Sequence, residues 1–230
     1  MIIVTGGAGF IGSALIWHLN QLGFRDILVV DRLGLENKWK NLAKRQFSWV
    51  QHKDQLQSWL TGEGAGQPVE AVFHMGASSS TTERDADYLM ANNLKYSMDL
   101  FAYCADRAIP YIYASSAATY GDGEFGFDDR SQDQAYRPLN PYGFSKQVFD
   151  QWVLQQTKQP PFWAGLKFFN VYGPNEYHKG AQSSVVYQFL PQAQQGQINL
   201  FKSYRSDVAH GEQARDFVYV KDVVAAMTHL

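Results

Sequence analysis

Short runs of β-branched and aromatic residues alternate along the chain with longer segments in which apolar residues recur at helical spacing. Such alternation is typical of βαβ units and predicts an open, mainly parallel sheet with helices on both faces. The predicted strands are residues 1–5, 27–31, 47–51, 70–74, 110–115 and 163–169, with a later one near 216–220. The predicted helices are residues 10–22, 85–107 and 141–156. The fold class is therefore α/β, with a doubly wound parallel sheet.

The pattern becomes looser after residue 169. A polar, helix-like run near 183–195 is followed by a stretch rich in charge and serine over 202–213, and polar loops are expected at 61–68 and 121–139. We expect residues 1–169 to form the main domain and residues 170–230 to form a small substrate-binding lobe, interleaved with the last strands of the sheet. The chain stops at Leu230, inside a helical pattern that begins at Lys221, so we expect it to be a piece of a longer protein.

Composition excludes several classes of protein. The 230 residues are 45% hydrophobic and only 18% charged, and 20 Lys+Arg against 22 Asp+Glu give a net charge of −2, which argues against nucleic-acid binding. The single cysteine, Cys104, precludes an internal disulfide, and the six histidines lack the spacing of metal ligands. Apolar runs fall short of the roughly 18 residues that cross a bilayer. We expect a cytoplasmic protein without a metal.

Three glycines follow the first predicted strand directly, where the first predicted helix begins. They are Gly6, Gly9 and Gly12 in the sequence T-G-G-A-G-F-I-G. A strand-to-helix turn of this kind lets the backbone approach a pyrophosphate, which then lies at the positive end of the helix. The position therefore indicates a Rossmann-type dinucleotide site, although an ordinary tight turn would need the same residues.

The end of the second predicted strand adds a ribose contact. Asp31 follows Gly12 by 19 residues, where a carboxylate usually binds the adenosine ribose. Arg32, Lys38 and Lys53 are cations that would attract a 2′-phosphate, which Asp31 alone would repel. This balance favours NADP over NAD.

A second set of residues predicts the chemistry. Ser116 follows the fifth predicted strand, and Tyr142 and Lys146 lie four residues apart, on one face of a predicted helix. A tyrosine has a pKa near 10, so a neighbouring lysine ammonium and a positive nicotinamide would help it act as a base. The residues alone therefore predict a nicotinamide-dependent enzyme that acts on a hydroxyl group.

The chain resembles the extended short-chain dehydrogenase/reductases, the NAD-dependent epimerase/dehydratase family that modifies nucleotide sugars. The resemblance is carried by M-I-I-V-T-G-G-A-G-F-I-G, D-I-L-V-V-D, Y-A-S-S-A-A-T-Y-G, F-N-V-Y-G-P and R-D-F-V-Y-V, and it runs through the whole sequence. The segments S-S-T-T-E and E-Y-H-K-G are similar to the branch that inverts C6 of an ADP-linked heptose for the lipopolysaccharide inner core. The resemblance implies a homo-oligomer, a pentamer, and an isomerase that works by transient oxidation with bound NADP.

The resemblance also assigns roles by position. It implies that Tyr142 and Lys179 are the two acid/base residues, supported by Lys146 and Ser116. The implied cofactor residues are Gly6, Gly9, Phe10, Ile11, Gly12, Asp31, Arg32, Lys38, Lys53, Met75, Gly76, Ala77, Ser78, Ser79, Asn92, Lys146, Val171 and Lys179. The implied substrate residues are Ser116, Asn170, Ala181, Gln188, Phe201, Lys202, Ser203, Tyr204 and Arg215.

The sequence departs from the family pattern at three of these positions. Arg32 stands where an asparagine is expected, Met75 where a glutamate is expected, and Gln188 where a histidine is expected. These changes concern the sugar and cofactor contacts more than the chemistry. Two alternatives remain open: another nucleotide-sugar epimerase or reductase, such as a UDP-hexose 4-epimerase, and a non-catalytic NADP-binding sensor.

Overall fold

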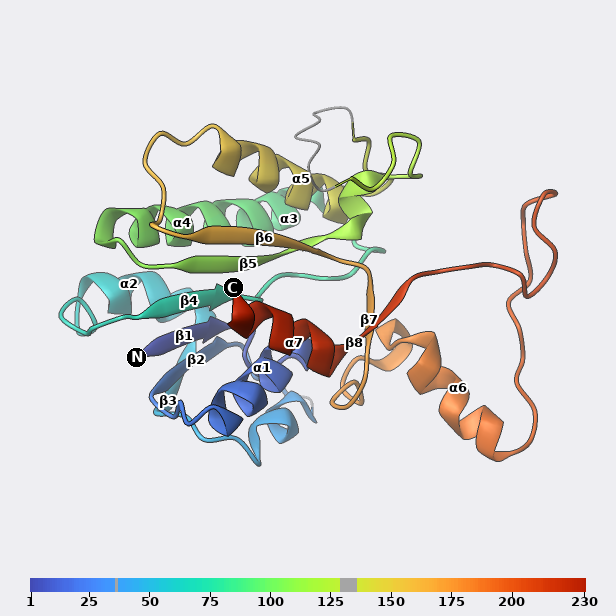
Figure 1. The fold of residues 1–230 in the computed structure, drawn as a ribbon, viewed down its shortest axis with the longest axis horizontal. Helices are drawn as coiled ribbons and strands as arrows, with labels where there is room; N and C mark the ends of the chain where they lie inside the picture. The colour runs from blue at the N-terminus through green and yellow to red at the C-terminus, as the bar shows by residue number, and fades with distance from the viewer. Residues whose placement is uncertain (36, 129–135) are drawn as a thin grey trace.

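A six-stranded parallel sheet forms the centre of the molecule in the computed structural model, which describes residues 1–35, 37–128 and 136–230 (Figure 1). Its strand order is β3-β2-β1-β4-β5-β6. The strands are β1 (Ile2–Thr5), β2 (Ile27–Asp31), β3 (Trp49–His52), β4 (Ala71–His74), β5 (Tyr111–Ser116) and β6 (Trp163–Phe168). This confirms the predicted Rossmann-type doubly wound sheet, with strand ends within two residues of those expected from the sequence.

Helices cover both faces of the sheet. On one face lie α1 (Phe10–Gln21) and α7 (Val220–His229), which pack against each other. On the other face lie α2 (Leu56–Thr61), α4 (Tyr96–Arg107) and α5 (Pro141–Leu154). The remaining helical elements are α3 (Ala86–Leu89), α6 (Val185–Gln194), a π-helical turn η3 (Met90–Lys95) and the 3₁₀ turns η1 (Asn37–Leu42), η2 (Lys53–Gln55), η4 (Ala117–Tyr120) and η5 (Gly180–Gln182).

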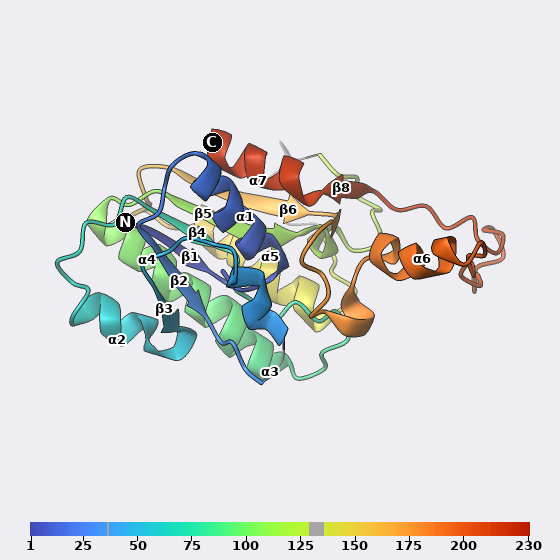
Figure 2. The ribbon, with the colours of Figure 1, turned by 90° about the horizontal axis from the view of Figure 1, so that it is seen from below.

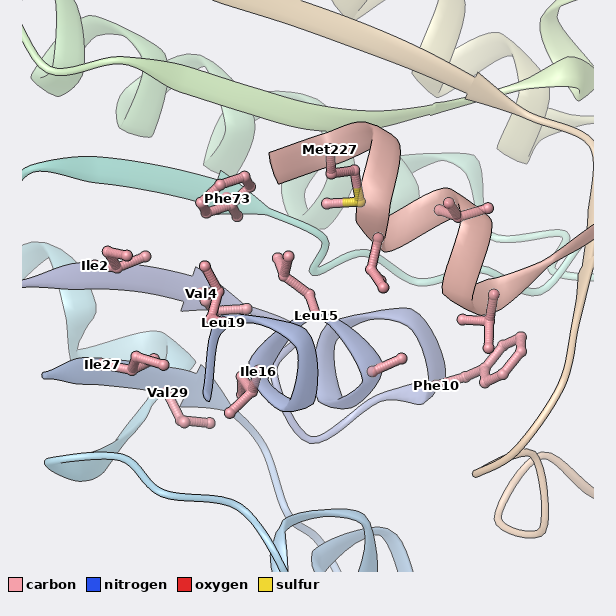
Figure 3. Close-up of a cluster of buried hydrophobic side chains, with 14 of the residues drawn as sticks. Ile2, Val4, Phe10, Leu15, Ile16, Leu19, Ile27, Val29, Phe73 and Met227 are labelled. Carbon is pink, nitrogen blue, oxygen red and sulfur yellow. The ribbon is translucent and has the colours of Figure 1, made fainter. Parts of the chain in front are cut away.

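The strands are apolar on both sides because the two helical layers bury both faces. Ile2 and Val4 of β1 point into the cluster with Leu15 and Ile16 of α1, whereas Ile3, between them, points into the cluster with α4 and α5. This is the period-two alternation of a strand. Figure 3 shows the first cluster, in which Met227 of α7 also takes part.

The sheet has its topological switch between β1 and β4. The chain winds outward from β1 to β2 and β3, then returns to pair β4 with the other side of β1 and continues to β5 and β6. In such sheets, ligands bind at the carboxyl ends of the strands on either side of this switch. The glycine turn after β1 and the loop after β4 therefore mark the expected binding edge.

Two predicted elements differ in the structure. The helix predicted over 85–107 is divided into α3, the π-helical turn η3 and α4, a local change that apolar periodicity does not reveal. The strand predicted near 216–220 does not return to the main sheet. It is β8 (Phe217–Tyr219), which pairs in parallel with the unpredicted β7 (Asn170–Tyr172) in a separate two-stranded sheet. The three-residue β7 is too short to give a period-two signal.

The segment between β7 and β8 leaves the body of the molecule. Figures 1 and 2 both show α6 and the following extended stretch projecting away from the sheet. Every residue of α6 is exposed or partly exposed, and Phe201 and Tyr204 beyond it are exposed. The predicted loop over 121–139 lies partly outside the described residues, because 129–135 are not among them.

A buried histidine connects the strands at the switch. Nδ1 of His74 lies 2.6 Å from Thr5 Oγ1, and Nε2 lies 2.8 Å from Ser97 Oγ. The Ser97 hydroxyl donates to Asn93 O and the Thr5 hydroxyl accepts from Gly76 N–H, so the ring fits as the neutral Nε2–H tautomer. Burial lowers the pKa of His74 to about 3.

His74→Gln should make the fold less sensitive to acid. Because the pKa of His74 is lowered on folding, its stabilising effect is present above pH 6.5 and is lost as the pH falls towards 3, while the unfolded chain takes up the proton. Between pH 7 and pH 5 this amounts to about 2 kcal/mol, which the variant should not lose. Urea unfolding at both pH values measures the difference, with exposed His229→Gln as the control. Equal losses in all three proteins would contradict it.

Candidate active site

The glycine turn after β1 is packed against the loop after β4. A Cβ placed on Gly6, which has a φ of +64°, would lie 2.7 Å from Cα of Gly76, and a Cβ on Gly12 would lie 2.2 Å from Gly6 O. Gly9 N–H donates to Gly6 O at 2.9 Å and Gly9 is the N-cap of α1. Only glycine fits these close approaches. No side chain caps the N-terminal amides of α1, so the phosphates of a dinucleotide could accept hydrogen bonds from these amides.

Asp31 at the end of β2 is held by its neighbours. Its Oδ2 accepts from Ala8 N–H at 2.9 Å, and its Oδ1 accepts from Arg32 N–H at 2.7 Å and from Lys38 Nζ at 2.5 Å. The Lys38 ammonium therefore balances the charge of this buried carboxylate. Exposed Arg32 and half-buried Lys38 present positive charge at the same strand end.

A pocket of about 500 Å³ opens beside Asp31, at the carboxyl ends of β2 and β3. It is lined by Asp31, Arg32, Leu33, Gly34, Leu35, Val50 and His52. Its walls combine apolar side chains with the two charges expected to contact a ribose. This pocket and the glycine turn together fit the adenosine half of a dinucleotide.

The loop after β4 carries five of the predicted cofactor residues, and a buried asparagine fixes it. Asn93 Oδ1 accepts from Ser78 N–H at 2.8 Å, while Asn93 Nδ2 donates to Ser78 O at 3.0 Å and to Ser145 Oγ at 3.2 Å. Ser145 precedes Lys146 on α5. One side chain therefore joins the predicted cofactor loop to the helix that carries the predicted catalytic residues.

Tyr142 and Lys146 lie on the first turns of α5, which Asn140 caps by accepting from Gly143 N–H. Lys146 is buried, with Nζ donating to Ala114 O at 2.8 Å. Burial lowers the pKa of Lys146 to about 8, and Asp150 opposes this shift. Burial raises the pKa of Tyr142, a side-chain hydrogen bond with Ser116 lowers it and the charge of Asp150 raises it. Ser116, Tyr142 and Lys146 thus meet at the carboxyl end of β5.

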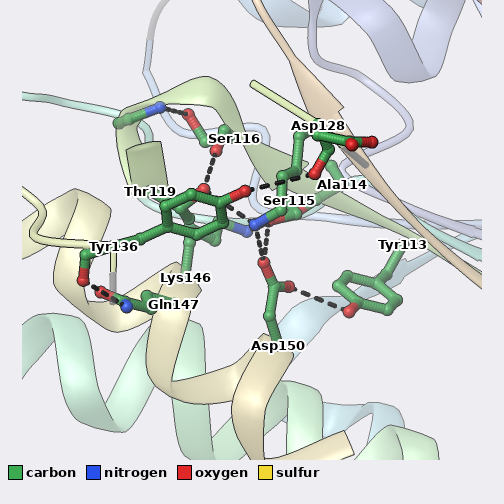
Figure 4. A network of polar contacts seen from close by, with 12 residues as sticks. Tyr113, Ala114, Ser115, Ser116, Thr119, Asp128, Tyr136, Lys146, Gln147 and Asp150 are labelled. Carbon is green, nitrogen blue, oxygen red and sulfur yellow. Dashed lines mark hydrogen bonds and ion pairs between the residues drawn. The ribbon is translucent and has the colours of Figure 1, made fainter. Parts of the chain in front are cut away.

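A polar network lies beneath these residues (Figure 4). Asp150 of α5 accepts from Tyr113 OH at 2.9 Å and from Ser115 Oγ at 2.6 Å. Lys167 Nζ on β6 lies 2.6 Å from Asp150 Oδ2 and donates to Thr119 Oγ1 at 2.8 Å. The network connects α5, β5, β6 and the turn after Ser116.

Lys179 reaches the start of α1 from the segment after β7. Its Nζ lies 4.9 Å from the centroid of the Phe10 ring and 3.5 Å from Oε2 of Glu176. Glu176 is buried, and it also accepts from Gly173 N–H, Ser184 N–H and Ser184 Oγ. Asn175 donates to Ser13 Oγ at 3.0 Å. The E-Y-H-K-G segment is therefore docked on the glycine-turn side of the sheet.

The other predicted cofactor residues lie near this edge in different settings. Phe10 and Val171 share one buried cluster, against which Ile11 and Met75 pack. Asn92 Nδ2 donates to Asn93 Oδ1 at 3.0 Å. Lys53 lies after β3, where its Nζ pairs with Asp54 at 2.6 Å.

The structure does not bring the predicted substrate residues together as one group. Gln188 Nε2 donates to Ser183 O at 2.7 Å and to Ala181 O at 3.3 Å, and Asn170 Nδ2 donates to Asp216 O at 2.9 Å at the base of the projecting segment. Exposed Arg215 donates to Ala214 O. The remaining ones lie on the extended stretch that Figures 1 and 2 show away from the sheet: Phe201, Lys202, Ser203 and Tyr204.

Sequence reasoning missed three residues of this site. Asn93 looks like an exposed polar residue beside Asn92, but it is buried within the π-helical turn η3. Asp150 continues the four-residue spacing of Tyr142 and Lys146, a signal present in the sequence. Glu176 lies three residues before Lys179, within the quoted E-Y-H-K-G segment, so its pairing was open to inference.

Comparison with known proteins defines the class. A family model described as the NAD dependent epimerase/dehydratase family matches residues 2–230, and the chain belongs to this family.

Particular relatives within the family are more informative. The chain is 55% identical over 232 residues to a Fusobacterium nucleatum protein named ADP-L-glycero-D-manno-heptose-6-epimerase, covering 99% of this chain and 70% of the relative. It is 52% identical over 229 residues to the Nitratidesulfovibrio vulgaris protein of the same name, covering 99% and 71%. These similarities extend over both the sheet and the projecting segment.

Solved structures agree with these similarities. The crystal structure of Helicobacter pylori ADP-L-glycero-D-manno-heptose-6-epimerase matches with a TM-score of 0.79 and 31% identity, covering 98% of this chain and 71% of that one. A UDP-glucose 4-epimerase from Thermotoga maritima, solved with UDP-glucose, matches with a TM-score of 0.77 and 28% identity, covering 98% and 71%. The sheet, the glycine turn and α5 thus belong to a fold shared by several nucleotide-sugar enzymes.

Two features are absent from residues 1–35, 37–128 and 136–230. These residues contain no helix with the length and apolar character needed to span a bilayer. Over the same residues, no group of three or more histidine, cysteine or acidic side chains is placed to hold a metal ion.

Proposed function

We propose that the chain is an epimerase that converts ADP-D-glycero-β-D-manno-heptose to ADP-L-glycero-β-D-manno-heptose by inverting C6 of the heptose. The observation that carries the reaction type is the buried Lys146, one helical turn from a tyrosine that is hydrogen-bonded with Ser116. The names and 52–55% identity of the relatives support the substrate. The product would serve the lipopolysaccharide inner core.

Tyr142 is the proposed base for the oxidation half-reaction. C6 of the heptose carries a secondary hydroxyl because C7 follows it, so loss of the hydroxyl proton and of the C6 hydride gives a ketone. When bound, a nicotinamide dinucleotide would accept the hydride in this half-reaction and return it in the next. Tyr142 takes the hydroxyl proton, Ser116 orients that hydroxyl, and the Lys146 ammonium stabilises the phenolate.

Inversion requires a proton donor and acceptor for the other face of the ketone, and we assign this role to Lys179. The hydride returns to the opposite face of C6, and the oxygen receives a proton, so the sugar must present that face to the dinucleotide. Lys179 lies at the start of α1 on a segment separate from the one that carries Tyr142. Glu176 holds it there as one partner of an ion pair.

NADP is the proposed cofactor, because positive charge surrounds Asp31. The carboxylate already accepts three hydrogen bonds, one of them from Lys38, and Arg32 is exposed beside it. A ribose bearing a 2′-phosphate would meet two cations and a neutralised acid at this edge. NAD lacks the group that these cations would bind.

Lys38→Gln should therefore weaken NADP⁺ binding by roughly tenfold or more, the range of one lost charge-assisted hydrogen bond. The affinity for NAD⁺ should change by less than about threefold, because NAD⁺ has no phosphate at this position. Isothermal titration of both dinucleotides measures the two constants, and exposed Lys44→Gln is the control. An equal loss of affinity for both dinucleotides would refute the assignment of Lys38 to the 2′-phosphate.

Other features of the proposal follow from the resemblance. Residues 170–230 form the substrate-binding lobe in this proposal, with Asn170, Ala181, Gln188, Arg215 and the stretch 201–204 contacting the nucleotide sugar. The proposed assembly is a homo-oligomer, a pentamer, located in the cytoplasm.

The decisive experiment incubates the protein with NADP⁺ and ADP-D-glycero-β-D-manno-heptose and separates the two C6 epimers by anion-exchange chromatography or NMR. Interconversion supports the proposal. A parallel incubation with NAD⁺ and UDP-glucose tests the 4-epimerase alternative. Conversion of UDP-glucose without conversion of the heptose would replace the proposed substrate, and dinucleotide binding without either conversion would favour a sensor.

A further inference from the structure

We propose that Asp150 is a positioning residue for catalysis, which fixes α5 against the strand ends that carry Ser116 and supplies the negative charge facing Lys146. This inference rests on the proposed function. Asp150 follows Lys146 by one helical turn and Tyr142 by two, so the three side chains share one face of α5.

The contacts of Asp150 lead to the residues on both sides of Ser116. Its carboxylate accepts from Tyr113 and Ser115 on β5, and Ser115 is directly followed by Ser116. Its ion pair with Lys167 leads to Thr119, which in turn donates to Ser116 O at 2.8 Å. Both flanks of Ser116 are thus tied to one carboxylate, whose side chain is only 16% exposed (Figure 4).

The charges around the carboxylate define its electrostatic effect. Tyr113 and Ser115 face it from β5, Lys167 from β6, and Lys146 and Tyr142 share its own helix. Lys167 Nζ lies 5.3 Å from the centroid of the Tyr120 ring and 5.8 Å from that of the Tyr136 ring. Buried His74 is neutral and adds no charge. Among the residues that the structure describes, Lys146 and Lys167 are therefore the cations that face the Asp150 carboxylate.

This carboxylate keeps Lys146 protonated in the working pH range. Burial lowers the pKa of Lys146 to about 8 even though the charge of Asp150 raises it. Without that charge, Lys146 would lose its proton near neutral pH and would no longer stabilise the Tyr142 phenolate. Asp150 also raises the pKa of Tyr142, so its removal lowers both pKa values.

Asp150→Asn should therefore shift both limbs of the pH profile of kcat to lower pH, by about one pH unit. It should also lower kcat at pH 8 by roughly fivefold, because the protonated share of Lys146 falls from about a half to about a tenth. The amide is nearly isosteric and still accepts a hydrogen bond on one oxygen. Asp106→Asn is the matched control, because Asp106 forms an exposed ion pair with Lys158 on the surface of α4, and its profile should not move.

Lys167→Met should produce the opposite shift. Removal of this cation leaves the Asp150 charge unbalanced, which raises both pKa values and moves the profile to higher pH. This variant also tests the proposal if Asp150→Asn does not fold. A residue that only stabilises the fold would lower kcat or the melting temperature in both variants and leave the two limbs in place, which would overturn the proposal.

A titration without substrate separates this inference from the proposed function. The absorbance of tyrosinate near 295 nm, measured as the difference between the protein and its Tyr142→Phe variant, isolates Tyr142 among the 13 tyrosines. The Tyr142 transition should move to lower pH in Asp150→Asn and to higher pH in Lys167→Met. Unmoved transitions overturn the inference whatever the substrate, whereas shifted transitions in a protein that does not convert the heptose would refute only the proposed substrate.

Discussion

Replacing Tyr142 by phenylalanine lowers the rate of C6 epimerisation by roughly 10²–10⁴-fold, the usual contribution of a positioned acid/base group. The ring keeps its place on the first turn of α5, where Tyr142 is half-buried at the carboxyl end of β5, and only the hydroxyl is lost. The affinity of this variant for the dinucleotide should stay within about twofold of that of the unmodified protein, because the Tyr142 hydroxyl is not part of the glycine turn.

This rate is measured by stopping the reaction at set times and separating the two epimers by chromatography. Tyr88→Phe is the matched control, because Tyr88 is 45% exposed on α3 and its hydroxyl can be removed without disturbing the site. A Tyr142→Phe protein that retains more than about a tenth of the rate would show that another group accepts the proton.

The second large effect is expected from Gly12→Ala. The added Cβ would lie 2.2 Å from Gly6 O and 2.8 Å from Cα of Gly7, so the turn must open or α1 must shift. Overpacking of this kind costs about 1–3 kcal/mol of stability. Dinucleotide affinity should fall by roughly 10–100-fold, because the displaced amides of α1 no longer converge on the pyrophosphate.

Two measurements distinguish a damaged turn from a damaged fold. Urea unfolding reports the stability loss, and isothermal titration reports dinucleotide binding. Gly66→Ala is the control, because a Cβ there meets no atom within 4 Å. Unchanged dinucleotide affinity in Gly12→Ala would mean that the cofactor does not lie over this turn.

The main sheet could be predicted from the sequence because its strands are strongly patterned. β1 and β2 are apolar at every position up to Thr5 and Asp31, and the glycines after β1 mark the beginning of α1. β7 escaped prediction because three residues give no period, and the same length left the pairing of β8 undetermined.

The catalytic residues were predicted from their spacing in the sequence, whereas the residues that support them are identified by their packing in the structure. Tyr142 and Lys146 are four apart in sequence, a relation that a helix preserves. The contact of Asn93 with Ser145 joins residues 52 positions apart, and that of Lys167 with Asp150 joins two different elements. The sequence alone does not show which distant polar side chains the fold brings into contact, so these supporting residues can be identified only from the structure.

The short ladder of β7 and β8 makes the segment between them exchangeable. Asn170 pairs with Phe217 and Tyr172 with Tyr219, so the two strands that flank residues 173–216 are held side by side in the two-stranded sheet. With its ends fixed, each doubling of such a segment costs only about 0.6 kcal/mol of closure entropy. Because this segment contains both Lys179 and most of the proposed sugar contacts, replacing it would change the proposed second acid/base group and the proposed sugar contacts in a single step. The glycine turn after β1 and helix α5 would stay unchanged while the segment that contacts the sugar differs.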